Sequence, residues 1–311
     1  MDKRIDYIDI AKAIGIILVY IGHCDLNYKS PLFLWIYSFH MPLFFFISGF
    51  LFKFHSQLSY DKIGKILYNK AISLLIPYLF FSIIQSITFI LFNIPLHNWI
   101  IKGWGTNPLW FLPVLFLIEV LHLCITSNKK ILIVASISII IGLFIYKTQT
   151  NRWLPYSISE IPWFYICFLE GYLCTHILQR KHFSCIITLF LLFLHYLLLF
   201  IIIIPYNDNY RTQDNDILSY VYRIIIGLVG TISFIGVSQI VNKIHQTQLL
   251  KWIGKNTLVI LCTHIMYIRI LQQVGCGYFS YLLAWFLIIP SILLYNKYIL
   301  PRITKLKKNI L

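Results

Sequence analysis

The sequence predicts an all-α protein, a polytopic membrane bundle of about ten transmembrane helices with both termini in the cytoplasm. Hydrophobic residues make up 59% of the 311 residues and charged residues only 12%. In a soluble domain about half of the residues are hydrophobic and about a quarter are charged. Apolar runs long enough to cross a hydrocarbon layer of about 30 Å recur along the whole chain. Lys and Arg gather between alternate runs. We therefore expect one membrane domain that covers residues 1–311.

Ten apolar runs mark the predicted spans, with edges located to about two to four residues. They lie at 7–26, 34–52, 71–93, 108–126, 131–146, 162–178, 183–204, 220–241, 256–272 and 280–296. The fifth and sixth runs are short, so a tilted or re-entrant segment there would change the topology. No soluble domain, long linker or fixed-period repeat interrupts the series.

The distribution of positive charge predicts the orientation. An even number of spans puts both termini on one side, which holds eighteen Lys and Arg residues against five on the other; the remaining three lie in or beside spans. Cytoplasmic loops are enriched in Lys and Arg, so we expect a multi-pass protein of the cell (inner, cytoplasmic) membrane, in contact with the lipid bilayer. The net charge of +15 comes mainly from Lys and Arg residues in the short loops between spans, a pattern that reflects membrane topology and not a nucleic-acid-binding surface. We therefore expect no nucleic-acid partner.

The seven cysteines fall mostly inside apolar runs, and no Cys-x-x-Cys pair occurs. A free cysteine in such a setting behaves as a small hydrophobic residue. We predict neither a metal site nor a disulfide framework.

The first span carries the most informative pair of residues, Lys12 and His23 in YIDIAKAIGIILVYIGH. Eleven residues apart, they differ by about 20° around a helix and by about 16 Å along its axis. Ionisable groups at membrane depth usually face a bundle interior or a watery path. A histidine satisfied at the interface and a lysine that reaches the headgroups are the alternative interpretations. Within the helix, only Asp9 is spaced to reach Lys12.

A second unusual string, SFHMPLFFFISGFLF, covers residues 38–52 and sets His40 and Ser48 among aromatic residues. Because the loop between the first two spans is short, His23 and His40 belong to one helical hairpin and are predicted to meet. With an unperturbed pKa near 6.5, a histidine can accept or donate a proton at physiological pH.

Further ionisable residues lie inside or beside later spans, and their number indicates a hydrated interior. Glu119, Glu170 and His264 lie in mid-span, with Arg223 and Arg269 near the outer ends of their spans. Buried opposite charges normally pair, so we expect Glu119 or Glu170 to contact Arg223 or Arg269. Structural ion pairs and catalysis are both compatible with this pattern.

Glycines and lysines at span ends have structural and functional interpretations. Gly49, Gly171 and Gly254 are expected to allow close helix packing or, where they lie beside a loop, to cap or start a helix. Lysines on the cytoplasmic side can hold phosphates or simply set the topology; these are Lys62, Lys65, Lys70, Lys251 and Lys255.

Taken in order, four strings resemble the acyltransferase-3 family of integral membrane acyltransferases. They are YIDIAKAIGIILVYIGH, SFHMPLFFFISGFLF, PLWFLPVLFLIE at 108–119, and WIGKNTLVILCTHIMY at 252–267. Lys12 and His23 match the family's pattern of a basic residue, a ten-residue gap and a histidine, although many members carry Arg at the first position. The first two strings are similar to the fucose 4-O-acetylase-like subgroup.

The resemblance implies an O-acetyltransferase that uses acetyl-CoA as acyl donor, with no permanently bound cofactor, and a carbohydrate hydroxyl as acceptor. The acceptor would be a cell-surface polysaccharide, an oligosaccharide or a lipid-linked precursor. His23 would be the general base, Lys12 would contact the donor, and His40 would be a further catalytic residue. Substrate would bind at Ser48, Trp110, Glu119, Glu170, His264 and Arg269, and donor phosphates at Lys12, Lys62, Lys65 and Lys255.

Several alternatives stay open at this point. Transfer can be direct or can pass through an acyl-enzyme. Some relatives carry a fused extracellular hydrolase-like domain that this sequence lacks, so we expect it to act alone or with partner proteins of a polysaccharide-assembly pathway. A polysaccharide or lipid-linked sugar transporter is the main rival function, although the paired broken helices of transporters are not evident. A surface-polysaccharide polymerase is a third, suggested by the acidic loop at 206–219.

Overall fold

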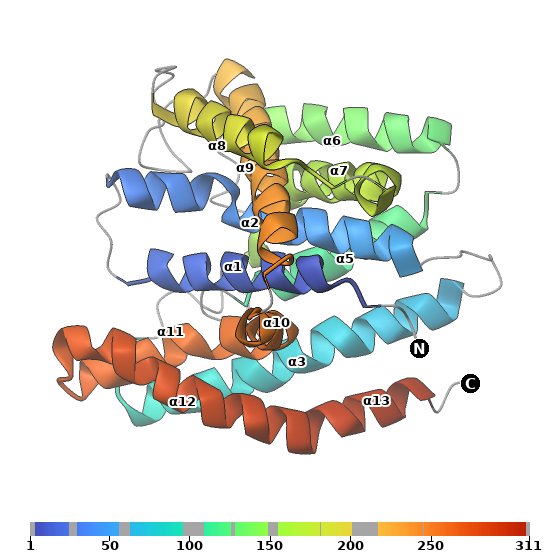
Figure 1. The fold of residues 1–311 in the computed structure, drawn as a ribbon. Helices are drawn as coiled ribbons and strands as arrows, with labels where there is room; N and C mark the ends of the chain where they lie inside the picture. Colours follow the sequence, from blue (N-terminus) through green and yellow to red (C-terminus); the bar gives the residue numbers. More distant parts are fainter. Residues whose placement is uncertain are drawn as a thin grey trace. The chain divides into compact units, whose positions relative to one another are not determined.

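The computed structural model describes residues 4–24, 30–55, 63–95, 109–125, 128–148, 155–180, 182–200, 217–244 and 246–308. Over these ranges the chain is built from helices, and no strand is present in them (Figure 1). The predicted all-α class is therefore confirmed for the described part of the chain.

The helices form two compact units. The first comprises Met1–Gln57, Ser127–Trp153 and Ser159–Lys255, and the second comprises Leu58–Thr126, Leu154–Ile158 and Asn256–Leu311. The four strings of the resemblance are divided between these units. Whether the units act as one membrane domain stays a prediction.

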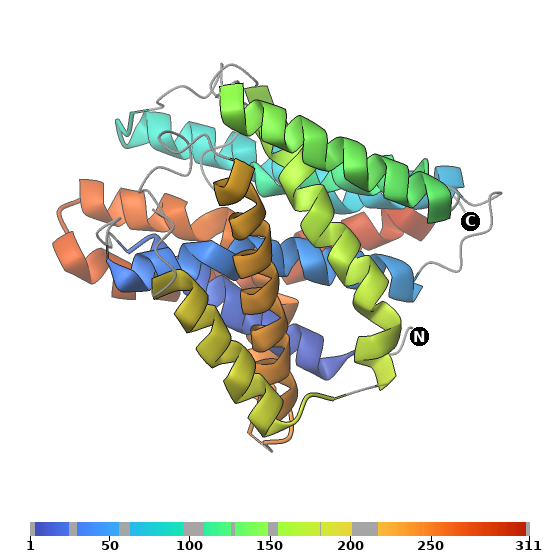
Figure 2. The same cartoon turned by 90° about the horizontal axis from the view of Figure 1, so that it is seen from above.

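Helix α2 is the centre of the first unit, because it contacts α1, α7 and α9. Around these, α8 packs on α9 and α6 on α7 (Figure 2), and α10 packs on α1 (Figure 1). Buried rings of α2, including Phe39, Phe46 and Phe50, pack with Phe234 of α9 and with Tyr7 of α1 in one core cluster. The helix bounds are α1 Asp6–Gly22, α2 Pro31–His55, α6 Asn128–Thr148, α7 Ile161–Arg180, α8 Cys185–Phe200, α9 Ile217–Val241 and α10 Gln248–Lys255.

Glycines allow α2 and α7 to cross with their backbones in contact. A Cβ atom at Gly49 would overlap the carbonyl oxygen of Phe168, and one at Gly171 would overlap the carbonyl oxygen of Phe46. Small residues permit this close approach in membrane bundles. The prediction that these two glycines serve close packing is confirmed.

The second unit contains α3 Ile63–Leu91, α5 Phe111–Leu123, α11 Thr257–Gln273, α12 Ser280–Leu294 and α13 Leu300–Lys308. Helix α3 packs on α5, α11 and α13, while α11 packs on α12. The buried Gln85 amide donates to the Cys262 carbonyl oxygen at 2.6 Å. A π turn, Tyr295–Ile299, joins α12 to α13, and there the Asn296 amide donates to Asn256 Oδ1 at 2.8 Å.

Every predicted apolar run coincides with a helix in its described residues. Five stretches are long and apolar enough to cross a membrane, at Pro31–Lys53, Ile63–Leu91, Ser157–Arg180, Tyr220–Val241 and Gly277–Lys307. Four further apolar helices are shorter, at Phe111–Leu123, Lys130–Ile145, Cys185–Phe200 and Thr257–Gln273. Many of their apolar side chains are exposed, as lipid contact requires. The chain is therefore a multi-pass membrane protein.

Four boundaries differ from the prediction. The first helix ends at Gly22, before residue 26, and α3 begins at Ile63, so Lys65 and Lys70 lie in a helix. A separate short helix, α10, precedes α11, and the last span continues through the π turn to Lys308. Hydropathy locates the apolar centre of a helix, whereas polar end turns are invisible to it.

Candidate functional site

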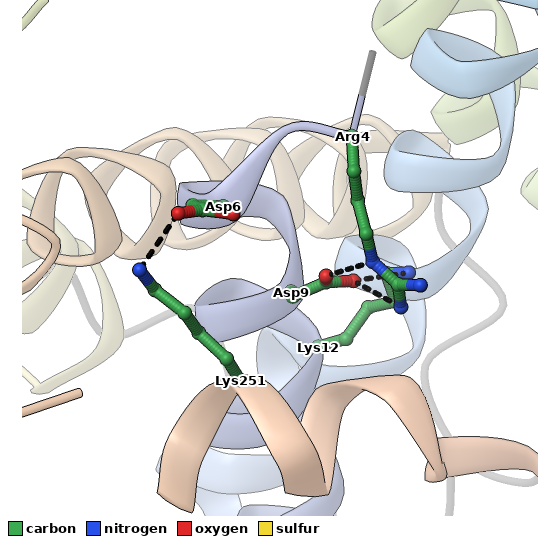
Figure 3. A network of polar contacts seen from close by, with 5 residues as sticks. All are labelled: Arg4, Asp6, Asp9, Lys12 and Lys251. Atoms are coloured by element: carbon green, nitrogen blue, oxygen red, sulfur yellow. Dashed lines mark hydrogen bonds and ion pairs between the residues drawn. The ribbon is translucent and has the colours of Figure 1, made fainter. Parts of the chain in front are cut away.

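The N-terminal end of α1 carries a cluster of three charged side chains. Lys12 Nζ lies 3.0 Å from Asp9 Oδ1, while Arg4 Nε lies 2.5 Å from Asp9 Oδ2 and Arg4 Nη2 3.4 Å from Oδ1 (Figure 3). The Asp9 side chain is 3% exposed. The predicted contact between Asp9 and Lys12 is confirmed, and Arg4 is a member that the sequence reasoning missed.

Local geometry explains how these residues meet. Asp9 and Lys12 are three residues apart in α1 and so share a face of the helix. Ile5, just before the helix, has an extended backbone (φ −106°, ψ 103°), and the Arg4 side chain runs back along the first turn (Figure 3). Acidic residues in a first turn also interact favourably with the helix dipole.

Helix α10 docks on this same turn of α1. A Cβ atom at Gly254 would overlap the Asp9 carbonyl oxygen, so only glycine allows the two backbones to meet there. This confirms the close-packing interpretation of Gly254. Beside it, Lys251 Nζ lies 2.7 Å from Asp6 Oδ2, a contact that Figure 3 shows apart from the Asp9 cluster. Lys255, at the end of α10, is exposed.

The other end of α1 is aromatic. His23 follows the last helical residue as its C-cap and is half-buried. The Tyr37 ring presents an edge-to-face contact to His23, with centroids 6.4 Å apart, and another to His40, at 4.7 Å. His40 is buried, and its Nδ1 lies 2.8 Å from the Ile36 carbonyl oxygen. Because a carbonyl only accepts, Nδ1 must carry the proton, which leaves Nε2 as the acceptor.

The two histidines therefore share a neighbour, Tyr37, in the hairpin of α1 and α2. The Tyr37 hydroxyl reaches back toward the Gly22 carbonyl oxygen at 3.5 Å. The sequence places the two histidines in one hairpin, and in the structure each of their rings contacts Tyr37.

Two further predicted residues of the first unit lie along the crossing of α2 and α7. The Ser48 hydroxyl donates to the Phe44 carbonyl oxygen at 2.8 Å, within its own helix. Glu170 is half-buried and precedes Gly171 of the crossing. Arg223, its predicted partner, lies over the Trp163 ring with 4.9 Å to the centroid.

The second unit holds the remaining predicted residues. Glu119 of α5 is buried and pairs with Lys70 of α3 at 2.6 Å, so the prediction of an arginine partner is wrong for this carboxylate. Lys70 reaches it because α3 packs on α5. His264 of α11 is fully buried, with Nδ1 2.9 Å from the Ile260 carbonyl oxygen.

The other residues of this set are at the edges of helices or on the surface. Trp110 immediately precedes α5 and is half-buried, Lys65 lies half-buried in α3, and Arg269 of α11 is exposed. Lys62 lies outside the described residues, as do the loop at 206–216 and Asp25.

One buried polar contact was missed by sequence reasoning. The Nε2 atom of the fully buried His195 in α8 lies 3.0 Å from the Ser38 hydroxyl in α2, and its ring meets Phe39 edge to face. A lone histidine in the apolar run FLLFLHYLLLF was the available signal. Its partner could be found only from the packing of the helices.

Comparison with family models returns a match over most of the chain. The acyltransferase-3 model, described as an acyltransferase domain, matches residues 5–295, a range that includes both ends of α1 and helices of both units. Searches of curated proteins and of solved structures return no match.

Proposed function

The chain belongs to the acyltransferase-3 family of membrane acyltransferases, and we propose that it is an O-acetyltransferase. In this proposal, it moves an acetyl group from acetyl-CoA to a hydroxyl of a cell-surface polysaccharide, an oligosaccharide or a lipid-linked precursor. The observation that carries the proposal is the pair formed by Lys12, in the second turn of α1, and His23, at its C-terminal end, inside the matched range. The fucose 4-O-acetylase-like resemblance is the support for a sugar acceptor.

His23 acts as the general base. It removes the proton of the acceptor hydroxyl while that oxygen attacks the thioester carbonyl carbon. The tetrahedral intermediate then collapses, the carbon–sulfur bond breaks, and the CoA thiolate takes the proton from His23. Its half-buried position at the helix end supports this role, because a base must be reachable by its substrate.

His40 stabilises the charge that develops on the carbonyl oxygen. The bond from its Nδ1 to the Ile36 carbonyl oxygen holds the ring in one orientation beside Tyr37. A fixed polar group is more effective for this purpose than one that must reorient during the reaction. In the neutral ring Nε2 only accepts, so His40 takes this role as an imidazolium, with both nitrogens protonated; the dipole at Ser48 is the alternative source.

Lys12 binds the donor, and basic residues of the cytoplasmic face bind its phosphates. The phosphate-binding set is Lys12, Lys62, Lys65 and Lys255. Acceptor binding is assigned to Ser48, Trp110, Glu119, Glu170, His264 and Arg269. Acetyl-CoA is a substrate in this scheme and not a resident cofactor.

The proposed topology has ten spans with both termini in the cytoplasm. Five long and four shorter apolar helices, together with α1, account for that number. The cytoplasmic membrane is the proposed location, since acetyl-CoA is then available on the side that carries most Lys and Arg. Partner proteins of polysaccharide assembly would supply or receive the glycan.

The proposal is tested by incubation of the purified protein in detergent with radiolabelled acetyl-CoA and a panel of sugars and glycan fragments. We expect label to move to a glycan with the wild-type protein and the transfer to be lost in His23→Ala. His176→Ala is the matched control, because His176 lies exposed on α7 and has no role in the scheme.

Retained transfer by a folded His23→Ala protein would overturn the assignment of the base. Uptake of a labelled glycan into vesicles without release of free CoA would instead establish a transporter.

A further inference from the structure

The cluster at the N-terminal end of α1 holds more positive charge than its carboxylate needs. Arg4 and Lys12 both contact Asp9, so two cations share one anion. Asp6, the other acid of this turn, is engaged by Lys251. The cluster of Arg4, Asp9 and Lys12 therefore keeps a net positive charge.

Hydrogen-bond donors also remain in this cluster. An ammonium group has three N–H donors and a guanidinium five. Contacts with Asp9 engage one from Lys12 and two from Arg4. Both side chains reach solvent, with Arg4 53% and Lys12 23% exposed, whereas Asp9 is 3% exposed. The Asp9 carboxylate thus contacts both cations on its buried side, and within the described part of the chain their remaining donors are open to an anion.

The chemistry of the two cations is complementary. Lysine offers a compact point charge, whereas the planar fork of arginine matches phosphate oxygens in pairs. Lys12 cannot form such paired hydrogen bonds, whereas Arg4, which contacts the same carboxylate, can. Gly254 and the α10 backbone pack on the turn on which Asp9 lies, so the carboxylate that both cations contact belongs to a closely packed part of α1.

The cluster also lies toward the N-terminal end of α1, which in the proposed topology faces the cytoplasm, where the acyl-CoA donor is available. His23 lies at the opposite end, about 16 Å along the axis from Lys12. A donor with phosphates at one end and a thioester at the other would lie along α1.

We propose that Arg4 is a second donor-binding residue, whose guanidinium contacts a phosphate of the acyl-CoA beside Lys12. Asp9 is the positioning residue that holds both cations in place. The inference rests on the proposed function for the identity of the donor.

The test compares Arg4→Gln and Arg4→Lys with the wild type, using acetyl-CoA and acetyl-pantetheine, which lacks the nucleotide and its phosphates. A charge-assisted hydrogen bond predicts a rise of about tenfold in KM for acetyl-CoA in Arg4→Gln. Arg4→Lys should recover part of this loss, because it keeps the charge without the fork. With acetyl-pantetheine, the three proteins should have the same KM.

Lys243→Gln is the matched control, since Lys243 is an exposed cation just after α9 in the same unit. Its KM for both donors should equal that of the wild type. An equal loss with both donors in Arg4→Gln would show that Arg4 only stabilises Asp9 and would overturn the proposal. An unchanged KM for acetyl-CoA would overturn it as well.

Calorimetric titration with free CoA separates this inference from the proposed function, because binding needs no acceptor. Weaker CoA binding by Arg4→Gln alone would support Arg4 even if no acetyl transfer to a glycan occurred. Absence of CoA binding by the wild-type protein would overturn the role of Arg4 directly.

Discussion

The two ends of α1 are held in contrasting ways. At the N-terminal end, charges and backbone contact dominate: Asp9 binds Arg4 and Lys12, and Gly254 of α10 meets the Asp9 carbonyl oxygen. At the C-terminal end, His23 is held by the edge of the Tyr37 ring. The first end is therefore held by ion pairs and backbone contact, whereas the second carries a half-buried histidine beside an aromatic ring.

This difference suggests a division of labour along one helix. A charged, tightly packed end suits the binding of an anionic donor, whose position should not vary. A half-buried histidine beside aromatic rings suits proton transfer to and from a substrate that must enter and leave. Three substitutions test this contrast, in order of expected effect.

Gly254→Leu should have the largest effect, because the new side chain would collide with the Asp9 backbone and separate α10 from α1. We expect a loss of about 3 kcal/mol in the free energy of unfolding, measured by denaturation in detergent. Gly64→Ala is the control: a Cβ there meets no atom within 4 Å, so stability should stay within about 1 kcal/mol. A stable Gly254→Leu protein would contradict the backbone contact.

Asp9→Asn should have the next largest effect. Loss of the buried carboxylate leaves Arg4 and Lys12 together without their counterion, and we expect a cost of about 2 kcal/mol, as for a hydrogen bond to a charged group, because both cations are partly exposed to water. Asp6→Asn breaks an ion pair whose carboxylate is 52% exposed, so at most about 1 kcal/mol should be lost. If both variants lost the same free energy of unfolding, the burial of Asp9 would not make its ion pairs stronger than that of Asp6.

Tyr37→Ala should affect the rate more than the stability. The ring contacts both His23 and His40, and its removal should lower kcat about tenfold, equivalent to about 1.4 kcal/mol in the barrier. Tyr37→Phe keeps the ring and removes the hydroxyl, whose contact with the Gly22 carbonyl oxygen is long at 3.5 Å, so kcat should change less than about twofold. A tenfold loss in Tyr37→Phe would assign the effect to the hydroxyl instead.

Much of the fold was predictable from the sequence. A run of apolar residues forms a helix in a membrane for a local reason, since every backbone polar group must be satisfied within the segment. All ten runs accordingly coincide with helices. The number of these helices that cross the membrane was less predictable, because four apolar helices are shorter than a full crossing. The short helix α10 is too polar to be recognised from hydropathy.

The site was predictable only where its residues are neighbours in the chain. Asp9 and Lys12 follow from helix periodicity, and Tyr37 and His40 share a face of α2 for the same reason. The choice of Lys70 as partner of Glu119 could not be read in this way, nor could the contact of His195 with Ser38.

By itself, the sequence determined an all-helical, multi-pass membrane protein with a lysine and a histidine at opposite ends of its first helix. The tertiary structure decided which cation meets which carboxylate and which glycine meets which backbone. The physical reason is range: hydropathy and helix periodicity act over a few neighbouring residues. Pairing across helices depends on which surfaces pack together, and for Asp9 that surface belongs to α10, more than two hundred residues along the chain.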